Sequence, residues 1–332
     1  MIHRVFSYNI LSSHLSDPEH FTACDRANLD PNTRLERILA KLDRETEQKT
    51  IICLQEVSLS WAGKLHKFFI DRNYYFVSTQ YGNPFNNYMG VGIAWPLDRY
   101  EVIDIDITRL SETRKWVKKP QIERIKEDIT KFFVTQLKLD KRKYADPLKE
   151  AKRRFNRLVF VRIKDKQEND NFCVATYHMP CAFYAPKVMT LHAAMAVQWV
   201  QKLAKEDPYV FTGDFNIKPG DLQYQLITTG AIDPASVAYP EAKWGDTWQP
   251  SLSEPLRSAY QEAFGQEPDF TNYAQVGNKQ PFIHTLDYIW LSKAWKVKSA
   301  MALSDRSEVN GPFPNEVEPS DHVAIAADLV LN

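Results

Sequence analysis

The chain has 332 residues, and its 42 lysines and arginines balance 42 aspartates and glutamates, which gives a net charge of zero. A zero net charge argues against a protein that coats nucleic acid through a basic surface. It does not exclude a nuclease, because a metal site and a local groove can hold a phosphate chain. The length and the 44% hydrophobic content are sufficient to bury a large core.

The cysteines and the N-terminal segment indicate where such a protein resides. The cysteines are scattered without the paired spacing of a zinc site, so we expect buried free thiols and a reducing compartment. They are Cys24, Cys53, Cys173 and Cys181. The first residues already have the pattern of a strand, which leaves no room for a signal peptide, and no apolar run reaches the length of a membrane span. We therefore expect a cytoplasmic (intracellular) protein with no membrane among its partners.

The first third of the chain alternates apolar runs with segments in which apolar residues recur at helical spacing. The expected elements are, in chain order, a strand at 5–11, a helix at 33–46, a strand at 51–57, a helix at 61–69, an extended segment at 74–79 and a strand at 90–95.

Charged residues dominate from 109 to 157, where the apolar pattern loosens. We interpret 109–157 as a surface insertion with some helix. Basic clusters at 141–143 and 152–154 leave two alternatives open, a solvated charged face and contact with nucleic acid. The aromatic residues interleaved with these clusters are Trp116, Phe132, Phe133 and Tyr144.

Regular structure resumes after the insertion. The expected elements are strands at 158–161 and 172–178, a helix at 187–205, a strand from 209 that leads into Asp214, a helix after Pro219 and Gly220, a helix at 256–264, and strands at 284–291, 296–302 and 322–331. The apolar strands are too continuous for one face to be open to water. We therefore expect a single α/β domain over 1–332, in which two packed sheets carry helices on the outside.

The end of one buried strand carries two polar residues, Asp214 and Asn216, in the stretch 212–216. Ligands of open α/β sheets bind at the carboxyl ends of the strands. Two positions apart on extended chain, the two side chains would point the same way, and an acid beside an amide suits the orientation of water next to a phosphate. The alternative is an Asx turn that closes the strand.

Polar residues recur at the ends of other apolar strands. Alone, His178 would be a satisfied core histidine, Asp287 a strand-end cap and Glu56 a satisfied core acid. Together the set offers acceptors for a hard divalent cation, an amide pair, and a histidine that an aspartate can orient, which indicates metal-assisted phosphoester hydrolysis. The set comprises Asn9, Glu56, His178, Asp214, Asn216, Asp287, Asp321 and His322.

These residues stand in motifs that resemble the endonuclease/exonuclease/phosphatase superfamily, and within it the deadenylase branch of carbon-catabolite-repression deadenylases, nocturnin and Angel proteins. The motifs follow the family's order and cover essentially the whole chain except 109–157. Besides Asn9 and His178, they are Leu54-Gln55-Glu56-Val57, Gly213-Asp214-Phe215-Asn216, Leu286-Asp287-Tyr288-Ile289 and Ser320-Asp321-His322, with Pro255 to Tyr260, Phe270 to Tyr273 and Pro314 to Glu316 typical of the branch.

The resemblance implies a four-layered sandwich of two mixed β-sheets flanked by helices, with Mg²⁺ (or Mn²⁺) as cofactor. It makes Glu56 the principal metal ligand, with Asn9 helping to hold the metal or the phosphate and Asp321 near the metal.

The resemblance also assigns catalytic roles to the remaining residues. Asp214 would orient or deprotonate the attacking water, while Asn216 and His178 bind the scissile phosphate. His322, oriented by Asp287, would stabilise the charge that develops on the phosphoryl oxygens.

The substrate is expected to be RNA or a nucleotide. The deadenylases carry a base-stacking proline after their histidine, and this proline is missing here. Phe282 stands where that branch has its base-stacking aromatic residue. The alternative is that Phe282 is a core residue. We expect a 3′-5′ exoribonuclease (deadenylase-like) that releases 5′-nucleotides. A phosphatase acting on a nucleotide or RNA-end phosphate is the alternative, and an inactive binding scaffold is a third. No docking domain for a partner protein is seen in the sequence.

Overall fold

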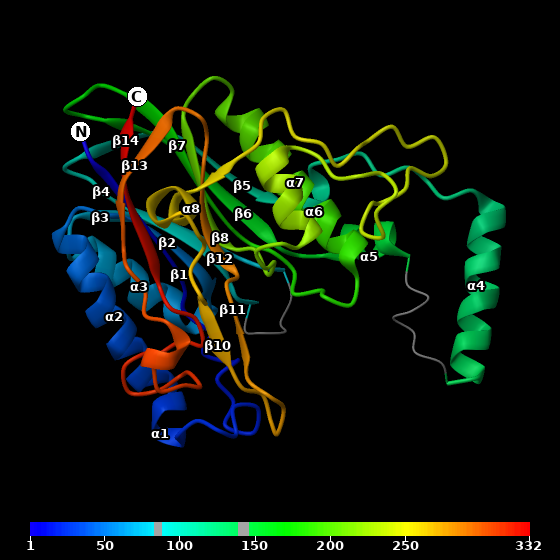
Figure 1. Ribbon diagram of the computed structural model, residues 1–332, viewed down its shortest axis with the longest axis horizontal. Helices are drawn as coiled ribbons and strands as arrows, with labels where there is room; N and C mark the ends of the chain where they lie inside the picture. Colours follow the sequence, from blue (N-terminus) through cyan, green and yellow to red (C-terminus); the bar gives the residue numbers. More distant parts are fainter. Residues whose placement is uncertain (83–87, 139–145) are drawn as a thin grey trace.

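The computed structural model describes residues 1–82, 88–138 and 146–332. Two six-stranded sheets lie face to face in it, with helices on their outer sides (Figure 1). The first sheet has the order β13-β14-β1-β2-β4-β3. Its strands are β1 (His3–Asn9), β2 (Ile51–Val57), β3 (Tyr74–Gln80), β4 (Gly90–Pro96), β13 (Trp295–Ala300) and β14 (Ile325–Leu331).

The second sheet has the order β5-β6-β7-β8-β12-β9, and a separate two-stranded ribbon pairs β10 with β11. Each large sheet is mixed, because one central pair is parallel (β1 with β2, and β7 with β8) and the other pairs are antiparallel. The strands are β5 (Tyr100–Arg109), β6 (Arg157–Asp165), β7 (Asn171–His178), β8 (Tyr209–Asp214), β9 (Arg257–Ser258), β10 (Asn272–Ala274), β11 (Phe282–His284) and β12 (Asp287–Leu291).

The two long covering helices begin where their sequences favour it. In α2, Pro31 is the first residue and the Asp30 carboxylate accepts from the backbone N–H groups of Asn32 and Thr33. Pro186 likewise opens α6. The helices are α1 (Arg26–Leu29), α2 (Pro31–Glu47), α3 (Leu59–Ile70), α4 (Gln121–Gln136), α5 (Pro147–Arg153), α6 (Pro186–Ala204), α7 (Leu222–Thr229) and α8 (Ala259–Phe264).

Alternation along the strands sorts side chains into three cores. Val5 and Cys53 point into the layer between the sheets, where they join Val174 and Val210 of the second sheet. The even-numbered neighbours in β1 and β2 face outward, against α2 and α3. A third core lies between the second sheet and α6. The expected four-layered sandwich of two mixed sheets is confirmed.

Some expected boundaries were wrong. The strand expected at 284–291 is two strands in different sheets, interrupted at Thr285 and Leu286. The helix expected from 256 begins at 259, after the short strand β9, and the last strand begins at 325 instead of 322. The strand β5 was missed because it lies at a sheet edge and exposes charged residues such as Glu101.

The insertion contains α4 and α5, which confirms that it has some helix. Its last part is more than surface, because Ala151 of α5 is fully buried in the core under the second sheet. Lys141, Arg142, Lys143 and Tyr144 lie outside the described residues. No helix of the described segments is both long enough and apolar enough to cross a membrane.

Gly213 marks a point where two strands approach closely. Its φ is +145°, and a Cβ placed there would lie 1.9 Å from the carbonyl oxygen of Tyr177 in the neighbouring strand β7. Replacing Gly213 with alanine should therefore lower the free energy of unfolding by about 2–5 kcal/mol, from the clash together with backbone strain. Urea denaturation measures the loss.

Gly63→Ala is the matched control for this change. Gly63 lies in α3, and an added Cβ there would meet no atom within 4 Å. Alanine should raise the free energy of unfolding by roughly 0.5–1 kcal/mol at this helical position. A Gly213→Ala variant as stable as the wild type would show that β7 and β8 can separate without cost.

Candidate active site

The two parallel strand pairs bring polar residues to one edge of the sandwich. Parallel neighbours have their carboxyl ends at the same edge of a sheet, and both pairs end in polar side chains. Asn9 is the last residue of β1 and Glu56 the next to last of β2, while His178 and Asp214 end β7 and β8. The expected clustering of strand-end residues follows from this arrangement.

Three of these residues form a row across the second sheet. His178 is paired with Asp214, and Asp214 with Asp287, on the adjacent strands β7, β8 and β12. Each follows the parity of inward-facing residues in its own strand, so all three side chains point into the layer between the sheets. All three are buried.

Glu56 reaches the same layer by a different route. Strict alternation would point it outward, because Gln55 already faces inward. The pairing of β2 with β4 shifts register between Gln55 and Val57, and Glu56 has a positive φ of 60°. This β-bulge re-aims the side chain, a feature typical of functional sites. Its Oε2 accepts from the backbone N–H of Ser12 at 2.9 Å.

Asp214 is the centre of the hydrogen-bond network. Its Oδ2 accepts from Nδ2 of Asn9 at 3.0 Å and lies 3.5 Å from Nε2 of His178 and 3.7 Å from Nε2 of His322. The same Nδ2 donates to Glu56 Oε1 at 3.2 Å. Burial raises the pKa of Asp214 to about 6, even though the two histidines act in the opposite direction.

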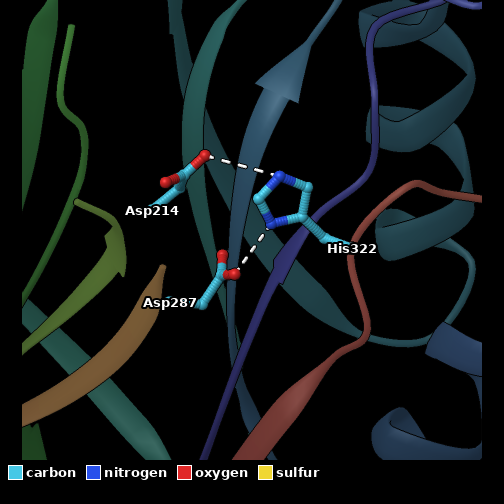
Figure 2. Close-up of side chains that lie close together, drawn as sticks. All are labelled: Asp214, Asp287 and His322. Atoms are coloured by element: carbon cyan, nitrogen blue, oxygen red, sulfur yellow. Dashed lines mark hydrogen bonds and ion pairs between the residues drawn. The ribbon is translucent and has the colours of Figure 1, made fainter. Parts of the chain in front are cut away.

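His322 is held from its other side by Asp287. Figure 2 shows the imidazole between two carboxylates, with Nδ1 2.7 Å from Asp287 Oδ2 and Nε2 facing Asp214. Burial alone would lower the pKa of His322, but the charges of Asp287 and Asp214 outweigh it and raise the pKa well above 6.5. The Thr271 hydroxyl also donates to Asp287 Oδ2, at 2.6 Å, and fixes the carboxylate.

Asn216 does not continue the strand. The strand β8 ends at Asp214, and Asn216 has a positive φ of 50°. The Asn216 backbone N–H donates to Asp214 Oδ1 at 2.9 Å, so the segment is an Asx turn, and the expectation of extended chain was wrong. The Asn216 side chain still lines the cavity described below, and its Nδ2 donates to the Met179 carbonyl oxygen at 2.9 Å.

Asp321 lies beside the bulged strand end. Burial raises its pKa, and Glu56 adds to this by like-charge repulsion. Arg34 lies beneath them, fully buried, with its guanidinium donating to the carbonyl oxygens of Ile10, Leu11 and Pro319 at 2.6–2.7 Å. Burial lowers the pKa of Arg34 to about 10. Through these three hydrogen bonds, Arg34 connects the end of β1 to the loop that carries Asp321.

The residues present fit a hard divalent cation. Oδ1 of Asp321 is buried without a hydrogen-bond partner among the described residues, and Glu56 and Asp321 are carboxylates of the kind that Mg²⁺ prefers. Asp214, Asp287 and His322 also place ligand atoms within 4.8 Å of one another. The raised pKa of His322 keeps a positive charge between Asp214 and Asp287, so these three residues have no need of a cation. Glu56 and Asp321 have no such charge between them and are therefore the better position for the cation.

One cavity of about 960 Å³ contains nearly all of these groups. Asn9 and Asp287 lie behind its wall and support the residues that line it. Phe282 lies on the rim, and its ring centroid is 5.8 Å from that of Phe183, which is half exposed. The predicted residues that line the cavity are Glu56, His178, Asp214, Asn216, Phe282, Asp321 and His322.

Sequence reasoning missed several supporting residues. Thr271 and Asn272 had been noted only as part of a branch motif, yet Thr271 fixes Asp287, and Asn272 Nδ2 donates to the backbone oxygen of Asp321 at 3.1 Å. Asn156 Nδ2 donates to the His178 carbonyl oxygen at 2.8 Å. Arg34 resembled any helical surface arginine, and only its contacts reveal its position.

The fold with this site defines the class of metal-dependent phosphoester hydrolases. The sequence model of the endonuclease/exonuclease/phosphatase family matches residues 6–322, and the chain belongs to that family. The expected family is therefore confirmed.

Relatives by sequence come from the expected branch. The CCR4-Not complex 3′-5′-exoribonuclease subunit Ccr4 of Aspergillus niger is 24% identical over 368 residues, which cover 98% of this chain and 51% of the relative. Carbon catabolite repressor protein 4 homolog 4 of Arabidopsis thaliana is 29% identical over 207 residues, which cover 58% of this chain and 45% of the relative. The chain thus spans about half the length of the curated relatives it matches.

Solved structures of low identity share the fold. ANGEL2, described as a 2′,3′-cyclic phosphatase and solved with adenosine-2′,3′-vanadate, has a TM-score of 0.74 at 19% identity, covering 100% of this chain and 96% of its own. The human Nocturnin catalytic domain with bound sulfate has a TM-score of 0.63 at 20% identity, covering 100% and 94%.

The charge state of His322 can be tested directly in the metal-free protein. In the wild type, His322 should keep its proton through neutral pH and lose it only as the pH rises through the raised pKa. Asp287→Asn removes an adjacent negative charge, so the variant should lose this proton at a lower pH. The imidazole resonances in an NMR titration measure the pH of proton loss in the wild type and in the variant.

His192 is an internal control for this titration. Burial lowers its pKa to about 3, so it should stay neutral over the same pH range in both proteins. Identical His322 titrations in wild type and Asp287→Asn would contradict the electrostatic coupling inferred from the 2.7 Å contact.

Proposed function

We propose that this chain is a metal-dependent phosphodiesterase that shortens RNA from its 3′ end and releases 5′-nucleotides, with adenylate-rich RNA preferred. One observation carries the proposal. The acid, amide and histidine groups suited to phosphoryl chemistry lie in the same cavity as two phenylalanine rings, Phe183 and Phe282, that are accessible to a base. The exoribonuclease relatives support it.

Glu56 and Asp321 are proposed to hold Mg²⁺ (or Mn²⁺). When bound, such an ion would polarise phosphoryl oxygens. The Asn9 amide group donates to both Glu56 and Asp214, so it fixes the distance between the metal-holding acid and the acid that handles water. Asn9 therefore supports the metal site through the orientation of its neighbours.

Asp214 is proposed to orient and deprotonate the attacking water. A pKa of about 6 leaves the carboxylate ionised at neutral pH yet basic enough to accept a proton. The Asn9 donor and the Asx turn fix both of its oxygens, so one orientation is favoured. In this role the Asp214 carboxylate must be unprotonated, so hydrolysis should be lost as the pH falls through its pKa.

The scissile phosphate is proposed to bind between His178, Asn216 and His322. Asn216 uses one amide N–H for the Met179 carbonyl oxygen and retains a second donor. His322 carries a stable positive charge because Asp287 and Thr271 secure its far side, so Nε2–H can stabilise charge that grows on the phosphoryl oxygens.

Phe282 and Phe183 are proposed to stack the terminal base. Phe183 lies in the segment after His178, where the deadenylases carry their stacking proline, and its ring contacts that of Phe282 at an interplanar angle of 48°. An aromatic ring in place of proline offers a larger face for a base.

A phosphatase that acts on a nucleotide or an RNA-end phosphate is the second candidate, and the similarity to ANGEL2 favours it. Both candidates use the same acids and histidines, so product analysis separates them. The proposed activity requires a ladder of shortened labelled RNA with 5′-monophosphates. Inorganic phosphate released from full-length oligoadenylate would establish the alternative. An inactive scaffold would yield neither product.

The metal assignment predicts a specific loss for Glu56→Gln. The amide keeps the shape and the acceptor for Ser12 but removes the charge, so hydrolysis at low Mg²⁺ should fall on the order of a hundredfold or more. Mg²⁺ binding measured by calorimetry should weaken as well. Glu150→Gln, on the cavity rim in α5, is the control and should leave Mg²⁺ binding unchanged. Near-normal turnover of Glu56→Gln at low Mg²⁺ would remove Glu56 from the metal site.

The base-stacking assignment predicts a substrate-dependent loss for Phe282→Ala and for Phe183→Ala. Stacking contributes roughly 1–3 kcal/mol per base, so cleavage of oligoadenylate should weaken about ten- to a hundredfold in kcat/KM. Hydrolysis of a small phosphodiester without a base should barely change. Phe264→Ala replaces an exposed phenylalanine outside the cavity and serves as the control. Equal losses on both substrates would assign the two rings a structural role.

A further inference from the structure

The helix α4 is turned with its polar face inward. Glu127 points toward the body of the protein, where its carboxylate pairs with Lys119 and Lys149 at 2.8 Å each, and Val134 on the same face is buried. The opposite face carries an unbroken apolar stripe. Its members are 52–64% exposed and comprise Ile122, Ile125, Ile129, Phe132 and Phe133, continued by Leu137 after the helix.

This orientation is the reverse of an ordinary surface helix, whose apolar stripe faces the core. Figure 1 shows α4 at the outer end of the molecule, apart from the helices that cover the sheets. The space on its inner side is a cavity of about 470 Å³, lined by charged side chains such as Arg124 and Asp128 together with Trp116 and Trp244. A contiguous exposed apolar stripe of this kind marks an interaction surface.

The charge of the surrounding segment narrows the choice of partner. Residues 109–157 contain 17 of the chain's 42 lysines and arginines but only 7 of its 42 aspartates and glutamates, a net charge of +10. The rest of the chain therefore carries −10. The zero overall charge conceals this separation, and the apolar stripe lies within the positive segment.

In contrast to the sequence-based expectation of no membrane partner, we propose that α4 is an interfacial helix that docks the protein onto an anionic lipid surface. Helices of this type combine an apolar face with basic residues, so that apolar burial and attraction to anionic headgroups act together. The helix α4 itself has three basic and three acidic residues, so here the basic residues are those of the flanking parts of 109–157. A second copy of the chain fits less well. A 16-residue helix is about 24 Å long and offers less area than a stable dimer needs, and two segments of charge +10 would repel each other.

The cavity that contains the proposed active site stays open in this arrangement. None of the described residues that line it belongs to α4. The helix α5 separates the two regions, with Lys149 and Lys152 lining the cavity beside α4 and Arg153 lining the active-site cavity. Docking through α4 would thus concentrate the enzyme at a membrane without blocking its substrate.

Vesicle flotation tests the proposal with the full chain. Vesicles of phosphatidylcholine with about 30% phosphatidylserine should carry the wild-type protein upward, whereas vesicles of phosphatidylcholine alone should carry much less. Raising the salt from about 0.1 to about 0.5 M should weaken the binding, because it shortens the screening length.

The double substitution Ile125→Glu/Ile129→Glu should reduce flotation about tenfold or more, because two apolar side chains are lost from the stripe. The matched control is Ile70→Glu/Phe264→Glu, which adds the same two charges at exposed apolar positions in α3 and α8 and should float like the wild type. Hydrolysis of a small phosphodiester should be unchanged in both variants, since no altered residue lines the active-site cavity.

Several results would overturn the proposal. Wild-type protein that does not float with anionic vesicles excludes it, as does equal flotation of the α4 variant. A dimer in solution that the α4 substitutions convert to a monomer, without vesicle binding, would assign the stripe to a second copy. Weaker oligoadenylate binding by the α4 variant, again without vesicle binding, would assign the segment to RNA.

Discussion

Burial of negative charge where the two sheets meet is the constraint on which the centre of this molecule depends. Glu56, Asp214 and Asp287 are each less than a tenth exposed, and an unpaired buried carboxylate is costly. Donors from separate elements offset this cost, namely the amide of Asn9 and the imidazole of His322. The positive charge of His322 is itself maintained by the acids that it neutralises. The packing of the two sheets and the charge balance of the site therefore depend on each other, because a shift of either sheet would leave a charged group unpaired.

The strand-end residues were predictable to the extent that they obey strand alternation. His178, Asp214 and Asp287 keep the inward parity of their strands, so pattern alone places them in one layer. Glu56 breaks that parity through a bulge that no local signal announces. Its position at the end of an apolar strand made it a candidate, but alternation alone would have pointed its side chain out of the layer. Thr271 could not be found from sequence pattern, because its importance lies in a contact with a strand 16 positions away. Layers and strand ends thus follow from local pattern, whereas the supporting contacts depend on tertiary packing.

The two sheets contribute different parts of the site. In each sheet a parallel pair is connected through a helix that covers the outer face of that sheet, β1 to β2 through α2 and β7 to β8 through α6. The first pair ends with Glu56, which is proposed to hold the cation, and with Asn9, whose amide orients Glu56. The second ends with those proposed to handle water and phosphate, His178 and Asp214. Neither half contains a complete set, so the chemistry exists only where the layers are docked against each other.

The pairing of β1 with β14 has a consequence for how the chain reaches its fold. His3 lies opposite Leu329, and β14 separates β1 from β13, so a strand from the far end of the sequence sits inside the first sheet. During synthesis, β1 can pair with β2 early, but its other edge stays open until residue 331 has left the ribosome. An open apolar edge is a template for mispairing with other chains. The high contact order of this closure makes folding slow, and nascent or truncated chains that lack β14 should depend heavily on chaperones.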